Sequence, residues 1–224
     1  MISVIIPALN EAESIGRAIA CAYDGGTGCE VIVVDGGSAD DTVRTAASHP
    51  GVKVLHSEKG RAVQMNRGAA EAAGDLLLFL HADTVLEAGW RAALDAALLD
   101  RSVVGGAFSL AVDNPAWKFR LVEGWVSLRS RFCGLPYGDQ AIFVRRGVFR
   151  RIGGYREIPL MEDVDLVERL GQNGRMVILT HRAVTSDRRW RRKGLLATAI
   201  ENQAMMLFYR LGADPRRLAL WYYR

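Results

Sequence analysis

An imidazole and a carboxylate, His81 and Asp83, stand two residues apart directly after five consecutive apolar residues, Leu76 to Leu80. Such a run predicts a strand buried on both faces of a parallel sheet. Side chains alternate along a strand, so His81 and Asp83 should point the same way. Ligands of open α/β sheets bind beyond the carboxyl ends of the strands. The pair is therefore a candidate metal site, although Asp83 could instead cap a helix that begins near Glu87.

A second pair of acids, Glu162 and Asp163, opens a predicted helix that runs to about Leu170. One of the two could act as a general base. The plainer alternative is that both are acids placed at a helix N-terminus, where the helix dipole favours them. The chain shows no Ser-His-Asp or Cys-His pattern for nucleophilic catalysis.

The turn after the first predicted strand, Pro7 to Glu11, contains no glycine, and the chain lacks a Walker A pattern. A dinucleotide site needs Gly-x-Gly-x-x-Gly in that turn, so a nicotinamide enzyme is not indicated. Asp35 ends the second predicted strand. It could accept hydrogen bonds from a base or a ribose, or it could cap its own turn before Ser38.

Four strand–helix units in the first hundred residues position these groups and predict a parallel sheet with helices on its faces. Asn10 with Glu13, and Ser38 with Asp41, have the spacing of helix caps. The predicted strands cover 2–6, 30–34, 52–55 and 76–80. The helices that follow the first, third and fourth strands are expected to end near 23, 73 and 99, and the helix after the second strand is expected to start near 41.

The second half changes character but shows no repeat and no linker. We expect one α/β domain over residues 1–224, with a nucleotide half (1–100), an acceptor half (101–193) and a helical tail (194–224). The predicted strands are 103–112, 141–144 and 176–179. The predicted helices are 115–132, 148–152, 162–170 and an amphipathic 195–211, with a basic run at 188–193 and aromatic residues at 221–223.

Composition predicts a folded chain with a mild preference for anionic partners. Half of the 224 residues are hydrophobic, and the net charge is +4. Three scattered cysteines, Cys21, Cys29 and Cys133, are typical of reduced thiols, so we expect a cytoplasmic protein. No signal peptide or membrane span is visible. No zinc-finger spacing or aromatic RNA-binding signature indicates nucleic acid.

Four motifs in this order resemble family 2 glycosyltransferases of the GT-A fold. They are residues 3–11 (SVIIPALNE), residues 33–42 (VVDGGSADDT), Gly74-Asp75 before the apolar strand, and residues 162–166 (EDVDL). The resemblance covers roughly residues 2–190. The His81-Ala82-Asp83 variant and Arg188-Arg189-Trp190 are similar to a short bacterial subfamily assigned to arsenosugar biosynthesis.

This resemblance implies inverting transfer from a nucleoside diphosphate sugar, of the UDP or GDP type, to an acceptor hydroxyl. Asp163 would be the base, beside Glu162. Asp83 would hold Mg²⁺ or Mn²⁺, a hard cation bridging the diphosphate. His81 replaces the first acid of the usual Asp-x-Asp, which favours Mn²⁺. A late metal ligand, near Asp187, stays open.

The resemblance also implies which residues contact the two substrates. The residues expected along the nucleotide and donor sugar are Pro7, Leu9, Glu11, Asp35, Gly37, Arg61, Met65, Asn66, His81, Ala82 and Asp83. The residues expected near the acceptor are Asp139, Gln140, Arg189 and Trp190. Residues 188–190 could instead be a solvated basic loop or touch anionic lipid.

Two other classes of function remain open. A nucleotidyltransferase would need a glycine-rich basic loop after the first strand, which Pro7 to Glu11 lacks. A non-catalytic protein could bind anions or a membrane through the basic run. The tail from about Leu195 has an apolar side that could form a homodimer contact, rest on a membrane, or cover its own core.

Overall fold

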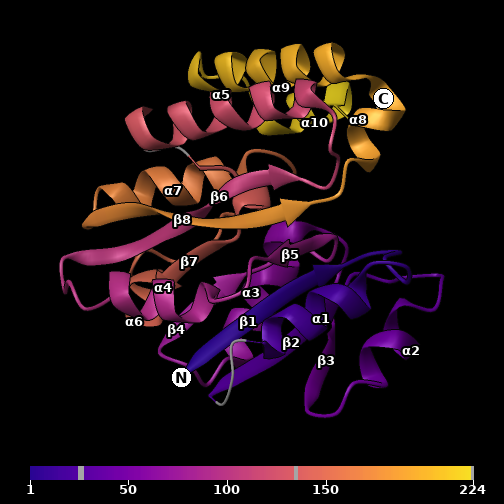
Figure 1. The fold of residues 1–224 in the computed structure, drawn as a ribbon, viewed down its shortest axis with the longest axis vertical. Helices are drawn as coiled ribbons and strands as arrows, with labels where there is room; N and C mark the ends of the chain where they lie inside the picture. Colours follow the sequence, from indigo (N-terminus) through magenta and orange to yellow (C-terminus); the bar gives the residue numbers. More distant parts are fainter. Residues whose placement is uncertain (25–27, 134–135, 223–224) are drawn as a thin grey trace.

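Eight strands form one mixed sheet in the computed structural model, which describes residues 1–24, 28–133 and 136–222 (Figure 1). The strand order is β3-β2-β1-β4-β7-β6-β8-β5. Four of the seven neighbouring pairs run parallel, which confirms the predicted α/β class. The strands are β1 Ile2–Ala8, β2 Cys29–Asp35, β3 Val52–His56, β4 Leu76–Phe79, β5 Thr84–Leu86, β6 Val103–Val112, β7 Ile142–Arg145 and β8 Arg175–Thr185.

The four strands predicted for the first half, β3-β2-β1-β4, are neighbours in the sheet and run parallel to one another. Every residue of β1 is buried, because packed side chains cover both faces. Ile6 belongs to one hydrophobic cluster, and Ile5 to the cluster on the other face together with Met65. A Cβ at Gly68 would lie 2.5 Å from Ile5 Cγ2, so glycine allows the third helix to pack closely on β1. The helices here are α1 Ile15–Tyr23, α2 Thr42–Ala47, α3 Arg61–Glu71 and α4 Trp90–Ala97.

The second half adds antiparallel pairing and a helical layer. β7 runs antiparallel to both β4 and β6, and β8 runs parallel to β6. The helices are α5 Trp117–Cys133, α6 Arg146–Arg151, α7 Glu162–Gly171, α8 Arg188–Lys193, α9 Leu195–Arg210 and α10 Pro215–Tyr222. Helices α5, α8, α9 and α10 lie together at the top of Figure 1, and we call them the helical layer.

The two predicted helix caps are wrong. α1 begins only at Ile15, and its N-cap residue makes no capping hydrogen bond with its side chain. Asn10 adopts a positive φ of 55°, and its side-chain oxygen accepts the N–H of Ala39 at 2.8 Å. Its own N–H donates to Ser38 Oγ at 2.9 Å. The two expected caps therefore join the loop after β1 to the loop after β2.

The sequence also missed parts of the second half. The segment between Asp83 and the helix expected from about Glu87 forms β5, a strand that was not predicted and that pairs with β8. β8 is longer than predicted and reaches Thr185. The basic run forms α8, so it is not a loop. Tyr223, Gly134 and Leu135 lie outside the described residues, as does the side chain of Cys133.

Candidate functional site

One cavity of about 330 Å³ brings together predicted site residues from both halves of the chain, and residues of the helical tail also line it. It lies where β4 ends and is closed on the other side by the loop before α7 and by the helical layer. The predicted residues that line it are Arg61, His81, Asp83, Asp139, Asp163, Arg189 and Trp190.

His81 and Asp83 both line this cavity, as their spacing predicted, although they sit in a turn after β4. The turn is closed by the Thr84 N–H, which donates to the His81 carbonyl at 3.1 Å. Burial lowers the pKa of His81, and the nearby Arg61 charge lowers it further, so the imidazole is neutral at pH 7. Asp83 does not cap a helix, because α4 begins after Gly89.

Arg188, which the sequence analysis did not assign to the site, contacts Asp83. Its Nη2 lies 2.6 Å from Glu11 Oε2 and 3.2 Å from Asp83 Oδ2. The guanidinium thus joins the loop after β1 to the turn after β4. A positively charged group already lies next to the carboxylate that was predicted to hold a cation.

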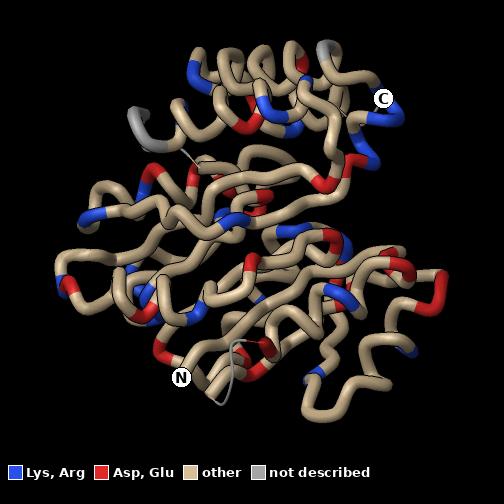
Figure 2. Tube along the Cα trace, in the orientation of Figure 1, with Lys and Arg blue, Asp and Glu red and all other residues tan. Residues whose placement is uncertain are grey.

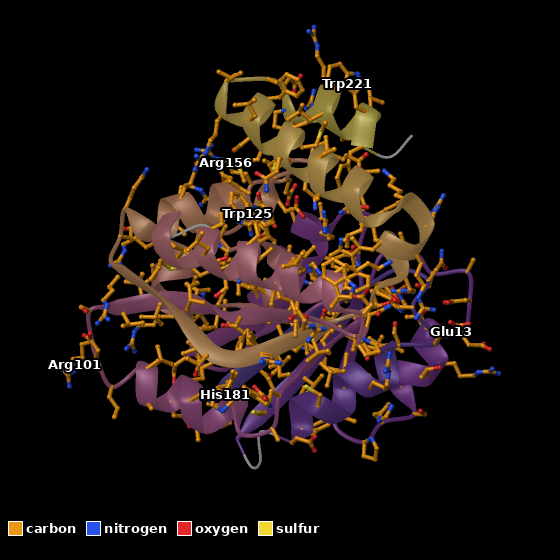
Figure 3. All side chains as sticks on the ribbon, turned by 45° about the horizontal axis from the view of Figure 1, so that its top comes forward. Glu13, Arg101, Trp125, Arg156, His181 and Trp221 are labelled. Atoms are coloured by element: carbon orange, nitrogen blue, oxygen red, sulfur yellow. The ribbon has the colours of Figure 1, made fainter. Side chains whose placement is uncertain are left out.

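Asp187, the open candidate for a late metal ligand, has a structural role in this conformation. Its buried carboxylate accepts hydrogen bonds from Asn114 Nδ2 at 2.6 Å and Arg191 Nε at 2.7 Å. It fixes the start of α8 and so positions Arg188. His181 does not line the cavity, and Figure 3 shows it well away from the helical layer.

Asp83 suits a cation that arrives with phosphate groups. Among the described residues, no cluster of three or more His, Cys, Asp or Glu side chains could hold a metal ion alone. Mg²⁺ commonly binds through one or two carboxylates, with phosphate oxygens and waters completing its shell. The Asp83 carboxylate, one quarter exposed and already facing a guanidinium, fits that pattern.

Asp163 is held rigidly at the cavity wall by two backbone N–H groups. Gly138 donates to Oδ2 at 2.6 Å and Val164 donates to Oδ1 at 2.8 Å. A Cβ at Gly138 would lie 3.2 Å from His81 Nε2 and 3.3 Å from Asp163 Oδ2. Glycine there lets the backbone approach both groups. Residue 161, just before α7, adopts a positive φ of 67°, a strained conformation of the kind found at functional sites.

Glu162 does not line the cavity but pairs with Arg61, a residue that does. Its side chain is 3% exposed, and its Oε1 lies 2.9 Å from Arg61 Nε. Burial raises the pKa of Glu162, while Arg61 works to lower it. The pairing orients Arg61 at the start of α3, which does line the cavity.

Asp139 lines the cavity, and buried polar atoms without hydrogen-bond partners among the described residues lie in its loop. Within the described part of the chain, its Oδ1 has no hydrogen-bond partner, and neither has Tyr137 Oη. Burial raises the pKa of Asp139 to about 6, although Arg129 works to lower it. Gln140 is fully buried and holds this loop: its Nε2 donates to the Phe108 carbonyl at 2.9 Å. Gln140 therefore positions Asp139 and does not line the cavity.

Arg189 and Trp190 are held by the helical layer. The Arg189 guanidinium lies 4.2 Å from the ring centroid of Tyr222 and donates to Asn202 Oδ1 at 3.0 Å. The Trp190 ring packs edge-on to Phe119, with 6.0 Å between centroids. Both side chains are thus packed against neighbouring side chains at the cavity wall.

Most of the residues expected to contact the nucleotide base and ribose do not line the cavity. Asp35 is 2% exposed, and its carboxylate accepts the N–H groups of Gly37 and Ser38. Burial works to raise the pKa of Asp35, but hydrogen bonds from the Ser38 side chain and from these N–H groups outweigh it, and the net shift is downward. The Asn66 amide bonds both the carbonyl and the N–H of Tyr155. The others outside the cavity are Pro7, Leu9, Glu11, Gly37, Met65 and Ala82.

A larger opening of about 800 Å³ adjoins the other side of Asp83. It lies between α1 and the strands β5, β6 and β8, and Arg17, Arg120 and Arg182 contribute to its lining. Asp83 is the predicted site residue that both spaces share.

Known proteins resemble this chain in sequence and in fold. The family model described as glycosyl transferase family 2 matches residues 3–150. A PGL/p-HBAD biosynthesis glycosyltransferase of Mycobacterium tuberculosis is 33% identical over 172 residues, covering 69% of this chain and 63% of that protein. An uncharacterized glycosyltransferase of the same species is 35% identical over 167 residues, covering 69% of this chain and 62% of that protein.

Solved structures share the fold. S. aureus TarS 1–349 in complex with UDP superposes with a TM-score of 0.67 at 20% identity, over 83% of this chain and 61% of that one. The mannosyltransferase PcManGT of Pyrobaculum calidifontis, in complex with GDP-Man and Mn²⁺, superposes with a TM-score of 0.61 at 23% identity, over 82% of this chain and 56% of that one. The chain thus spans about three fifths of the length of these relatives.

Proposed function

Because the chain belongs to glycosyl transferase family 2, we propose that it moves a sugar from a nucleoside diphosphate sugar to an acceptor hydroxyl with inversion. One observation carries the proposal: Asp163 and Asp83 line the same cavity from distant parts of the chain. One carboxylate can take a proton, and the other can hold the cation that accompanies a diphosphate. The same arrangement argues against a non-catalytic anion-binding protein, which would need no carboxylates there.

Asp163 is the proposed base. Inverting transfer needs one group to accept the proton of the acceptor hydroxyl as it attacks the anomeric carbon, and it needs no protein nucleophile. The hydrogen bonds from Gly138 and Val164 fix both carboxylate oxygens, so their remaining lone pairs have a defined direction. Glu162 acts in this scheme through Arg61, as a positioning residue.

Asp83 is the proposed metal ligand, with His81 beside it. Mg²⁺ or Mn²⁺, when bound, would offset the negative charge that develops on the leaving diphosphate. Arg188 and Arg61 would add positive charge at the same place. The solved structure of PcManGT contains GDP-Man and Mn²⁺, and TarS structures contain UDP and UDP-GlcNAc. We therefore propose a UDP- or GDP-type donor for this chain.

The two substrates would approach from different parts of one domain. We propose that residues 1–100 bind the donor, with Arg61 and Asp83 nearest the diphosphate. Residues 101–193, with the tail 194–224, would bind the acceptor through Asp139, Arg189 and Trp190. Asp35 would contact the base only if the turn that its carboxylate now closes rearranges. The narrower assignment to the arsenosugar subfamily rests on His81-Ala82-Asp83 and Arg188-Arg189-Trp190 and does not extend to the acceptor.

A thermal-shift panel tests the donor side directly. UDP, GDP, dTDP and CDP are each added with and without Mn²⁺, because a ligand that binds only the folded state raises its melting temperature. We expect UDP or GDP to stabilise the protein, and to do so more strongly with Mn²⁺. A panel in which no nucleotide stabilises the protein would contradict the proposal.

The proposed place of action is the cytoplasm. Cys21 and Cys29 are both free thiols, and burial raises the pKa of each. Unpaired thiols persist in a reducing compartment.

A further inference from the structure

The exposed large apolar side chains of the described residues gather on the helical layer. Apart from Met1 and Leu99, all of them lie on α5, α9 and α10 or directly after α9. Figure 3 shows Trp125 and Trp221 on this layer. An exposed apolar patch of this kind marks an interaction surface. On α5 the exposed side chains are Trp117, Leu121, Trp125 and Leu128, between 51% and 75% exposed.

These side chains form stripes along the helices. The α5 residues are spaced by four, four and three positions, which places them within an arc of about 80°. Phe119 and Val126 of the same helix are buried, so α5 packs on the body through another side. On α9, Ile200 and Leu207, with Leu211 just beyond the helix, fall within an arc of about 40° and are also exposed.

Positive charge accompanies the apolar stripes. Residues 188–224 contain nine Lys and Arg against two Asp and Glu, a net charge of +7, while residues 1–187 carry a net −3. Figure 2 shows the basic positions that recur along the helical layer. Lys118 and Arg120 flank the α5 stripe, and Arg216 and Arg217 are exposed on α10.

The charge decides which partner fits. A second copy of the chain would bring two segments of net +7 together, and like charges repel. An anionic lipid surface accommodates both features, because aromatic and aliphatic side chains enter the headgroup boundary while basic ones contact the phosphates. We propose that the helical layer docks on the surface of an anionic membrane. Among the described residues no helix is long and apolar enough to cross a bilayer, so the contact is peripheral.

Docking would place the candidate site close to the membrane. Thr198 and Asn202 of α9 and Tyr222 of α10 line the same cavity as Asp163. The docking proposal does not depend on glycosyl transfer, and its test uses no sugar.

Co-sedimentation with lipid vesicles tests the proposal. We expect the protein to pellet with vesicles of phosphatidylcholine plus phosphatidylglycerol, more weakly with phosphatidylcholine alone, and less as salt increases. The double variant Trp117→Ser/Trp125→Ser should lose most of this binding. The matched control Leu99→Ser removes a side chain that is 84% exposed but lies on the segment after α4, and it should bind like the wild type.

A charge-reversal pair makes the test independent of the tryptophans. Arg216→Glu/Arg217→Glu should weaken binding at least about tenfold, since each basic residue near an anionic surface adds to the attraction and each acidic one repels the surface. Arg150→Glu/Arg151→Glu, on exposed positions at the end of α6, changes the net charge equally and should bind like the wild type apart from a general charge effect.

Three outcomes would overturn the proposal. In the first, the protein does not bind anionic vesicles. In the second, the charge reversals on α10 and on α6 weaken vesicle binding equally. In the third, the protein is a dimer on size-exclusion chromatography, and Trp117→Ser/Trp125→Ser dissociates it. The last would assign the surface to a second copy.

Discussion

The Arg188 guanidinium lies against the Asp83 carboxylate, with 3.2 Å between Nη2 and Oδ2, and it contacts Glu11 as well. A metal ion bound by Asp83 would therefore compete with this guanidinium for the carboxylate. The contact is partly exposed and contributes only about 0.2–1 kcal/mol.

Replacing this arginine should make Asp83 more available to a metal ion. Arg188→Ala should tighten the binding of Mn²⁺ to the protein saturated with UDP or GDP by up to about fivefold, measured by titration calorimetry, because a competing cation is removed. Arg44→Ala, which breaks an exposed pair with Asp41, is the control and should change nothing. Weaker Mn²⁺ binding by Arg188→Ala would mean that Arg188 does not compete for this carboxylate.

Asp83 and His81 should differ in their importance for nucleotide binding. Asp83→Ala should abolish the extra thermal stabilisation that Mn²⁺ gives to UDP or GDP binding, because the carboxylate supplies the charge that holds the cation. His81→Ala should only weaken it, since the pKa of the imidazole is lowered by burial and the group is neutral at pH 7. An equal Mn²⁺ response in Asp83→Ala and the wild type would refute the assignment.

Asp139 should make stability depend on pH. Its pKa is raised to about 6 in the folded state, above its value in the unfolded chain, because burial disfavours the charged form. Between about pH 4 and pH 6 the folded state therefore binds more protons, and stability falls as the pH rises through that window. Above about pH 6 the carboxylate is charged in the folded state, and the burial of that charge lowers the stability by its full amount.

Asp139→Asn should consequently stabilise the protein at pH 8 and lose that advantage near pH 4. Each kcal/mol corresponds to about 2–4 °C in melting temperature for a chain of this size. Melting curves of variant and wild type across this pH range measure the difference. A melting-temperature difference that stays constant with pH would show that Asp139 is not buried as a charge.

Replacement by alanine should have opposite effects on stability at two of the glycines. A Cβ at Gly106 on β6 would lie 2.1 Å from the Val177 carbonyl oxygen on β8, so Gly106→Ala should cost about 1–3 kcal/mol or more through strain. A Cβ at Gly124 on α5 would have no atom of the described residues within 4 Å outside its own helical turn, and Gly124→Ala should stabilise the helix by about 0.5–1 kcal/mol. Urea unfolding compares them, and equal effects would contradict the packing of β6 on β8.

The sequence predicted the parallel core and several of the site residues because both leave local signals. A run such as Leu76 to Leu80 needs a strand buried on both faces, and the acids at strand ends or helix starts are visible without knowing their partners. His81, Asp83 and Asp163 were found in this way, and the cavity unites them.

The parts that were missed depend on contacts between distant segments. Arg188 looks like any other member of its basic run, and only the fold brings it to Glu11, 177 residues earlier. Asn10 and Ser38 have capping sequences but hydrogen-bond to each other's loops. β5 is too short to leave a periodic signal, and it forms because β8 offers it an edge. Gly138 is a glycine because His81 and Asp163 approach its backbone.

The rate of nucleotide release by Asp163→Asn tests the central claim most directly. The assay follows UDP or GDP set free from its nucleotide sugar with Mn²⁺ and water as the acceptor, so it needs no knowledge of the natural acceptor. Asparagine keeps the shape of the side chain but cannot take a proton. The rate should fall about 10²–10⁴-fold while nucleotide binding stays as in the wild type. Asp75→Asn, at a side chain that is 88% exposed, is the control for a charge lost elsewhere. A near-normal rate in Asp163→Asn would contradict the assignment of Asp163 as the base.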